Sequence, residues 1–241
     1  LNAIEAARGH GMRILSLVNV LGSTLTRESE RYLPLACGYE ISVPATKTFL
    51  NQAIAFLALA LRAGRHPADV LTPVPRLLEE TIERVEEQVE AVEPGLAGHD
   101  DLYVLGYGLT YPIALEGALK LKEVTYAHCE GMLSTEFKHG PLSAVTEGYP
   151  VLFAGGPEDV GLLVSGINET TCRGGRAIVF AEEDPRLLIN ADGLVRLPRA
   201  GALLNPLLAT VPLQLLAYKH GVARGYDPDF PRNLSKTLTV D

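Results

Sequence analysis

The sequence predicts an α/β fold built on parallel sheets, and three observations support this prediction. Short apolar segments recur along the chain, as in parallel strands that are covered by helices on both faces. These segments alternate with stretches of helical periodicity. The composition, with 47% hydrophobic and 21% charged residues among 241, supplies the core of one large or two small domains.

Residues 1–75 are interpreted as part of a first domain. Leu1–Arg8 has a helical pattern, and the continuous apolar run Ile14–Val20 is typical of a buried strand. A short strand at Glu40–Val43 and a helix over 46–62, with threonine at its N-cap, are predicted to follow. We expect the chain to begin inside this domain, because its first residues already have the pattern of a helix body.

Residues 76–98 are predicted to form a linker helix, and residues 99–225 a second domain. The apolar face of the linker helix is predicted to contain Leu78, Ile82, Val85, Val89 and Val92. Strands of the second domain are predicted at 102–105, 151–154, 178–181 and 194–197, with helices at 111–126 and 160–172. A last helix, 203–223, is expected to be interrupted near Pro212, and residues 226–241 form a C-terminal tail.

The composition excludes several function classes. A formal net charge of −8 argues against a nucleic-acid partner, although it still permits a small phosphorylated ligand. The three cysteines are too few and too scattered for a disulfide framework or a zinc site, so no metal is expected. The apolar run Ala53–Leu61 is too short to span a bilayer, and no targeting segment is recognised. We therefore expect a cytoplasmic protein with no membrane partner.

One stretch concentrates the groups that could perform chemistry. A predicted strand runs through the turn 106–108 into a helix that carries Glu116, Lys120 and Glu123. Intervals of four and three residues place these side chains on one side of the helix. His139 follows inside a Gly-Pro turn. A carboxylate, an ammonium group and an imidazole suit acid–base chemistry on a sugar, and a glycine-rich strand-to-helix junction favours phosphate binding.

Each of these residues also has a purely structural interpretation. Glu123 could be an exposed helical glutamate paired with Lys120, and His139 a hydrogen-bonded structural histidine. Lys236, near the C-terminus, would normally be solvated. A terminal segment that closes over a site could instead desolvate this lysine, lower its pKa and make it a nucleophile toward a ketone.

The runs PIALEGALKLKE, EFKHGPL and PLQLLAYKHGVARGYDPDFPRNLSKTLTVD resemble the isomerase half of the glucosamine-6-phosphate synthases. The segments Asn19–Ser23 and Arg27–Ser29 are similar to the same family. The resemblance covers nearly the whole chain, and its motifs are long and specific. It implies two sugar isomerase (SIS) domains with flavodoxin-like βα layers, followed by a C-terminal tail at the active site. The first domain would be incomplete at its N-terminus, and its phosphate-binding loop would precede Leu1.

The resemblance also implies roles for single residues. Glu123 matches the base that moves a proton between C1 and C2 of the sugar. Lys120 matches a lysine that stabilises the enediolate, with Glu116 as its partner. His139 matches a histidine that opens the sugar ring in the neighbouring subunit of a homodimer. Lys236 matches a lysine that forms a Schiff base with fructose 6-phosphate.

Three further positions match substrate contacts in the family. Val43 matches a backbone contact to the sugar, and Ser235 stands where the family usually has alanine. Ala45 departs from the family, which usually has a serine hydroxyl on the ligand there. The loss of one such hydrogen bond costs roughly 0.5–1.5 kcal/mol. No cofactor is implied.

The resemblance leaves three functions open. The first is the enzyme that forms glucosamine 6-phosphate from fructose 6-phosphate and ammonia from glutamine, with a glutaminase domain expected upstream. The second is a related SIS enzyme, such as a fructosamine-phosphate deglycase or an amino-sugar-phosphate isomerase/deaminase, which Ala45 mildly favours. The third is a non-catalytic phosphosugar-binding regulator. Retention of Glu123, His139 and Lys236 together argues against this third function, since a sensor needs none of them.

Overall fold

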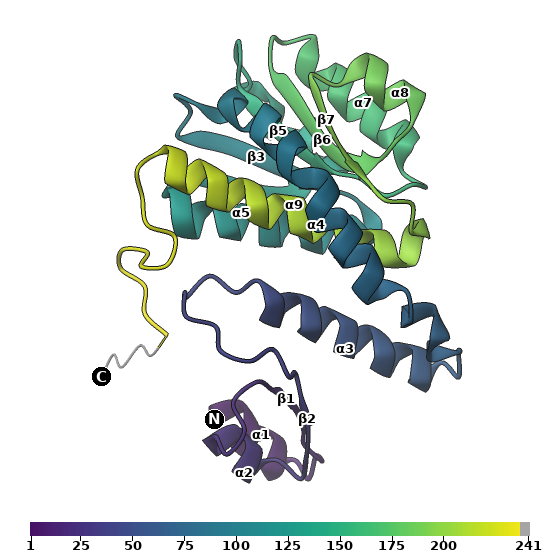
Figure 1. Cartoon of the computed structure of the whole chain (residues 1–241), viewed down its shortest axis with the longest axis vertical. Coiled ribbons are helices and arrows are strands. Elements are labelled where there is room, and N and C mark those ends of the chain that lie inside the picture. The colour runs from purple at the N-terminus through teal and green to yellow at the C-terminus, as the bar shows by residue number, and fades with distance from the viewer. Residues whose placement is uncertain (237–241) are drawn as a thin grey trace. The chain divides into compact units, whose positions relative to one another are not determined.

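A computed structural model describes residues 1–236 of the chain, which form two compact units. The first unit comprises Leu1–Ile41 and Ala45–Leu71, and the second comprises Ser42–Pro44 and the chain from Thr72 onward. Figure 1 shows the first unit in purple and dark blue and the second, apart from Ser42–Pro44, from blue to yellow. The finer division predicted from the sequence, with a linker helix and a separate tail, stays a prediction.

The first unit is a small α/β layer. Its elements are α1 (Asn2–Gly9), β1 (Leu15–Val18), α2 (Thr24–Glu28), β2 (Arg31–Pro34), α3 (Lys47–Ala63) and the 3-10 turn η1 (Ala68–Leu71). Strands β1 and β2 pair in parallel, with Leu15 opposite Arg31. Ser23 caps α2 by accepting a hydrogen bond from the Thr26 amide. The strand predicted around residues 14–20 is confirmed at its centre.

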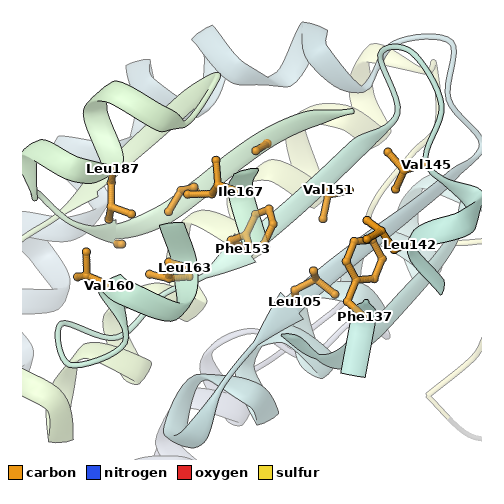
Figure 2. Packing of buried hydrophobic residues seen from close by; sticks show 13 residues of the cluster. Leu105, Phe137, Leu142, Val145, Val151, Phe153, Val160, Leu163, Ile167 and Leu187 are labelled. Carbon is orange, nitrogen blue, oxygen red and sulfur yellow. The ribbon is translucent and has the colours of Figure 1, made fainter. Parts of the chain in front are cut away.

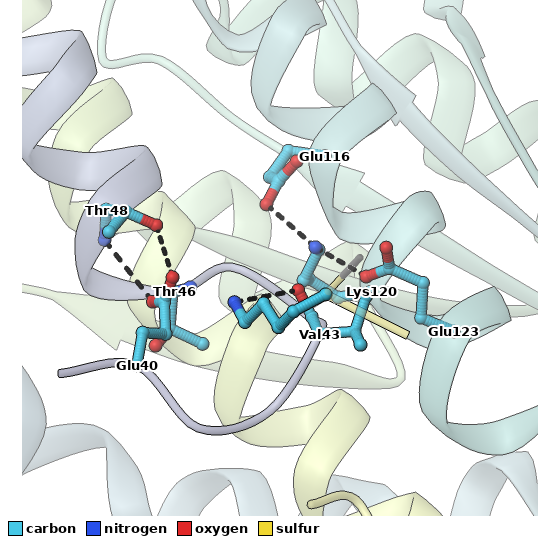
Figure 3. Close-up of polar contacts among 8 residues, drawn as sticks. Glu40, Val43, Thr46, Thr48, Glu116, Lys120 and Glu123 are labelled. Carbon is cyan, nitrogen blue, oxygen red and sulfur yellow. Dashed lines mark hydrogen bonds and ion pairs between the residues drawn. The ribbon is translucent and has the colours of Figure 1, made fainter. Parts of the chain in front are cut away.

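The strand predicted at Glu40–Val43 is wrong, because this segment is irregular and the second strand is β2. The Glu40 carboxylate instead accepts hydrogen bonds at the N-terminus of α3, from the Thr46 amide at 3.1 Å and the Thr48 hydroxyl at 2.6 Å (Figure 3). Thr46 occupies the N-cap as predicted, but its own side chain makes no capping hydrogen bond. The need to satisfy the helix terminus outweighs the strand propensity of the segment.

The second unit is a five-stranded parallel sheet with strand order β4-β3-β5-β6-β7. The strands are β3 (Asp101–Gly106), β4 (His128–Leu133), β5 (Pro150–Ala154), β6 (Arg176–Glu182) and β7 (Gly193–Leu197). The helices are α4 (Val74–Val92), α5 (Tyr111–Thr125), α6 (Ser134–Phe137), α7 (Val160–Thr171), α8 (Pro185–Asn190) and α9 (Gly201–Ala223), with 3-10 turns at 93–96, 108–110 and 141–144. Numbered within the unit, this strand order is 2-1-3-4-5, the flavodoxin-like doubly wound topology.

Right-handed crossovers decide which helix covers which face of the sheet. The step from β3 to β4 runs toward one edge and carries α5, while the steps from β4 through β7 run the opposite way and carry α6, α7 and α8. Helix α9 packs on α5 and α4, so these three helices share a face (Figure 1). The core of the opposite face, shown in Figure 2, joins Leu105, Val151 and Phe153 of the strands to Phe137, Leu163 and Leu187 of the covering helices.

Helix α4 begins earlier and faces the core differently from the prediction. It begins at Val74 and buries Val74, Leu77, Thr81, Val85, Val89 and Val92. Ile82, predicted on the apolar face, is 55% exposed. Thr81 takes the buried position because its hydroxyl donates to the Leu77 carbonyl at 2.6 Å, which satisfies its polar group.

Helix α9 runs unbroken through Pro206 and Pro212, so the interruption predicted near Pro212 is wrong. Tertiary packing outweighs the local cost of proline, since every residue from Leu204 to Leu213 is buried. Among the described helices, α9 alone is long and apolar enough to cross a membrane by length and composition. Its most apolar window is 67% buried within the protein, as in the core helix of a layered fold.

Strand β4 and helix α8 were not predicted from the sequence. Strand β4 lies at the edge of the sheet, and Cys129 is its only buried residue, so it lacks the continuous apolar run of a central strand. Helix α8 has six residues, capped by the Asp184 carboxylate, which accepts from the Arg186 amide at 2.9 Å. Elements this short and this exposed leave little periodicity to detect.

Candidate active site

A tight turn between β3 and α5 positions the helix with the charged residues. An added Cβ at Gly106 would lie 2.4 Å from the Thr110 carbonyl oxygen, so only glycine fits this position. The Thr110 hydroxyl donates to the Ala154 carbonyl of β5 at 2.8 Å and fixes the turn to the neighbouring strand. Pro112 lies in the first turn of the helix, where it removes no intrahelical hydrogen bond.

Glu116, Lys120 and Glu123 lie on one side of α5, as their spacing predicted, and form a charged stripe that is largely buried. The Lys120 Nζ lies 2.5 Å from Glu123 Oε2 and 3.5 Å from Glu116 Oε1 (Figure 3). The side-chain exposures are 4% for Lys120, 9% for Glu116 and 17% for Glu123. Both contacts are ion pairs between side chains of low exposure.

The stripe carries two carboxylates for one ammonium group. Burial raises the pKa of Glu116 above its ordinary value of 4.5, and the charge of Glu123 acts in the same direction, while Lys120 opposes both effects. Glu123 is the less buried of the two carboxylates and is held by Lys120 through one oxygen. This arrangement suits a base that must meet a substrate while its negative charge stays balanced.

Val43 and Lys236, both predicted as site residues from the resemblance, lie together in the second unit. The Lys236 Nζ donates to the Val43 carbonyl at 3.5 Å. The neighbouring Ser42 hydroxyl donates to the Pro228 carbonyl at 2.6 Å. Residues 42–44 therefore belong with the C-terminal segment, the part of the chain from Tyr226 to Lys236. Ser235, which precedes Lys236, is exposed. Residues 237–241 of the predicted tail lie outside the described part of the chain.

Ala45 is the first residue past this segment and clusters with the first unit. It is partly buried. Its methyl group offers no hydrogen bond to a ligand at the position where the resemblance implies a serine hydroxyl.

His139 is not brought to Glu123 within one chain. It is exposed, follows α6, and its amide donates to the Glu136 carbonyl at 3.0 Å. Because α5 and α6 cover opposite faces, the sheet separates the two residues.

A cavity of about 250 Å³ lies at the carboxyl ends of β3 and β5, the switch point of the sheet. It is lined by residues of the turn Tyr107–Thr110 and by Gly156, Glu158 and Asp159. Burial raises the pKa of Asp159, with a further contribution from Glu158. These carboxylates oppose the phosphate binding that the glycine-rich junction suggested. Within residues 1–236, no group of three histidine, cysteine or acidic side chains is placed to hold a metal ion.

Sequence analysis missed Tyr126, the residue that ends α5. It adopts the left-handed conformation at φ 59° and contacts the C-terminal segment. The signal for this residue was a tyrosine at the predicted end of the helix, where glycine or asparagine is usual.

The SIS domain family matches residues 95–220 of this chain. Over its whole length the chain is 39% identical to the glutamine–fructose-6-phosphate aminotransferase [isomerizing] of Symbiobacterium thermophilum. It is 40% identical to the protein of the same name from Pyrobaculum aerophilum. The chain spans 42% and 41% of these relatives, about two fifths of their length.

Solved structures show the same fold. The C-terminal domain of glucosamine-fructose-6-phosphate aminotransferase from Francisella tularensis superimposes with a TM-score of 0.84 and 29% identity, covering 93% of this chain and 68% of that one. Glucosamine-6-phosphate deaminase from Thermotoga maritima has a TM-score of 0.78 at 22% identity, covering 98% of this chain and 70% of that one, which shows the fold alone. The sheet therefore defines a flavodoxin-like α/β protein, and the chain belongs to the SIS domain family.

Proposed function

We propose that this chain is the sugar-phosphate isomerase part of a glutamine–fructose-6-phosphate aminotransferase. The whole enzyme would convert fructose 6-phosphate, with ammonia released from glutamine, to glucosamine 6-phosphate. The observation that carries the proposal is the buried stripe of α5, in which Lys120 balances Glu123 at 2.5 Å. Identity of 39–40% along the full chain to relatives of that name supports it.

In this mechanism the Lys236 amine attacks C2 of the open-chain ketose and water leaves, which forms a Schiff base. Ammonia then replaces the lysine at C2 and frees its amine. The Glu123 carboxylate takes the proton from C1 and returns it to C2 through an enolamine, so the sugar is isomerised without any change in oxidation state. Lys120 balances the charge as the proton moves, and Glu116 holds Lys120 in place. Val43 and Ser235 present backbone groups to the sugar.

His139 opens the sugar ring of the neighbouring protomer in a homodimer. The position of His139 on the sheet face opposite to Glu123 supports this assignment, because no single chain unites the two residues. Histidine suits the step because its ordinary pKa lies near neutrality. A glutaminase domain in the remaining part of the protein supplies the ammonia, and the enzyme works in the cytoplasm.

A related enzyme is the second candidate, namely a fructosamine-phosphate deglycase or an amino-sugar-phosphate isomerase/deaminase. Ala45 favours it, because a missing hydroxyl contact indicates a different sugar substituent at that position. Both candidates use Glu123 in the same proton transfer. The nitrogen donor distinguishes them, since only the aminotransferase consumes glutamine.

The proposal is tested by solvent-deuterium exchange into the sugar. In the natural full-length protein, Glu123→Gln should lower deuterium incorporation at C1 of fructose 6-phosphate by about 10²–10⁴-fold, the usual contribution of a positioned base. Glu90→Gln, on the exposed face of α4, is the matched control and should exchange at the parental rate. Parental exchange in Glu123→Gln would remove Glu123 from the mechanism.

The same variants test the sharing of sites between protomers. Glu123→Gln and His139→Ala proteins, each nearly inactive, are unfolded, mixed in equal amounts and refolded. Mixed dimers contain one site with both groups intact, so about a quarter of parental activity should return. No recovery beyond the sum of the two single variants would contradict a His139 contributed by the neighbour.

A further inference from the structure

Tyr126 ends helix α5 in a backbone conformation that tyrosine rarely adopts. Its φ of 59° lies in the left-handed region, and its amide donates to the Lys122 carbonyl at 3.2 Å. Glycine and asparagine adopt this conformation with less strain, so the capping role alone would favour either of them. The presence of a large aromatic residue therefore calls for a contact that only its side chain makes.

The Tyr126 side chain contacts the C-terminal segment at two residues. The Arg232 guanidinium lies 4.0 Å from the centre of the Tyr126 ring, within the range of a cation–π interaction. The Arg232 amide donates to the Tyr126 hydroxyl at 2.8 Å. The ring of Tyr226 lies 4.6 Å from that of Tyr126, at an interplanar angle of 59°.

These contacts lie between the end of α9 and Lys236. Tyr226 follows the helix, Arg232 is six residues further on, and Lys236 is four residues beyond Arg232. Arg232 and the residues after it as far as Lys236 are exposed, so burial does little to hold them. The contact with Tyr126 therefore restricts how far the Lys236 amine can move from its position at the Val43 carbonyl.

We infer that Tyr126 is a positioning residue that holds the C-terminal segment through Arg232 and thereby sets the place of Lys236. This role rests on the proposed function of Lys236 as the group that bonds the sugar. Tyr126 follows Glu123 by three residues on the same helix, so one helix end orients both the base and the segment carrying the amine. The Tyr126 side chain thereby links the placement of the base to that of the segment carrying the amine, beside the contact of Ser42 with Pro228.

The test compares three substitutions in the natural full-length protein. Tyr126→Asn keeps a residue suited to the left-handed conformation but removes the ring and the hydroxyl. Tyr126→Phe keeps the ring and removes only the hydroxyl. Tyr39→Asn makes the same change at a tyrosine that is 93% exposed and serves as the control.

The first measurement is hydrogen exchange of the C-terminal peptide without sugar, which does not depend on catalysis. Exchange at Arg232 should be about fivefold faster in Tyr126→Asn, the effect of losing an exposed cation–π contact and one hydrogen bond. Tyr126→Phe should be intermediate, and Tyr39→Asn should match the parent. Exchange in α5 should stay unchanged in all three variants, because asparagine and phenylalanine both still end the helix.

The second measurement is borohydride trapping of fructose 6-phosphate, with mass spectrometry of the adduct. Trapping at Lys236 should be about fivefold slower in Tyr126→Asn at saturating sugar, with partial recovery in Tyr126→Phe. Unchanged hydrogen exchange at Arg232, or faster exchange with trapping at the parental rate, would overturn the inference. Absence of any adduct at Lys236 in the parent would instead refute the role proposed for Lys236, and hydrogen exchange would still decide whether Tyr126 anchors the segment.

Discussion

The second unit contains two clusters of the same composition, each with one lysine between two glutamates. In α5, Lys120 lies 2.5 Å from Glu123 and 3.5 Å from Glu116. In the other cluster, Lys219 of α9 lies 2.5 Å from Glu90 and 3.1 Å from Glu86, both on α4. The distances are similar, but the two glutamates of α4 are more than half exposed, whereas those of the α5 stripe are largely buried.

The difference shows that burial, rather than the residue types or their distances, decides what such a cluster can do. Water screens the charges on α4, so the glutamates there mainly raise the pKa of Lys219. In the α5 stripe the carboxylates have lost most of their hydration, and burial raises the pKa of Glu116. A buried charge needs its partner in place, which makes the stripe costly to disrupt and suited to proton transfer.

The largest expected effect comes from Lys120→Met, which leaves two buried carboxylates without their ammonium group. We expect the second unit to lose about 3–5 kcal/mol of unfolding free energy at neutral pH, as when one partner of a buried ion pair is removed. Native-state hydrogen exchange of the β3 and α5 amides measures this loss. The loss should shrink as the pH falls and the carboxylates become protonated. A loss independent of pH would indicate that only packing of the lysine side chain matters.

A smaller effect concerns the pH dependence contributed by Glu116. Its pKa is raised in the folded state, so in the range above 4.5 the folded protein binds more protons than the unfolded one. This contribution to stability is fully present below pH 4.5 and is lost as the pH rises through the folded-state pKa. Glu116→Gln removes it, so the stability of the variant relative to the parent should increase with pH above 4.5. Thermal unfolding at several pH values tests the sign, and a decrease instead would mean that attraction to Lys120 outweighs desolvation.

The smallest effect is expected for Lys219→Met in the exposed cluster. The two glutamates regain full hydration when the lysine is removed, so the melting temperature should shift far less than in Lys120→Met. Any shift should vanish in 1 M salt, where the Debye length falls to about 3 Å. A shift comparable to that of Lys120→Met would contradict the comparison between the two clusters.

The sequence by itself determined the fold class and the spacing of the candidate site. Apolar runs such as Val151–Ala154 and Ile178–Ala181 specify central parallel strands, because both faces of these strands must be covered. The intervals between Glu116, Lys120 and Glu123 follow from helical geometry alone, so their common side was predictable. The resemblance of the motifs to the SIS family was equally local, since it depends on contiguous residues.

Only the tertiary structure decided the features that depend on neighbours distant in sequence. Ile82 is exposed and α9 passes through Pro212 unbroken, because packing between helices outweighs local pattern and propensity. The burial of the α5 stripe and the contact between Val43 and Lys236 depend on segments that no sequence periodicity relates. The separation of Glu123 from His139 follows from the order of the strands, because the direction of each right-handed crossover, rather than any residue type, assigns a helix to its face of the sheet.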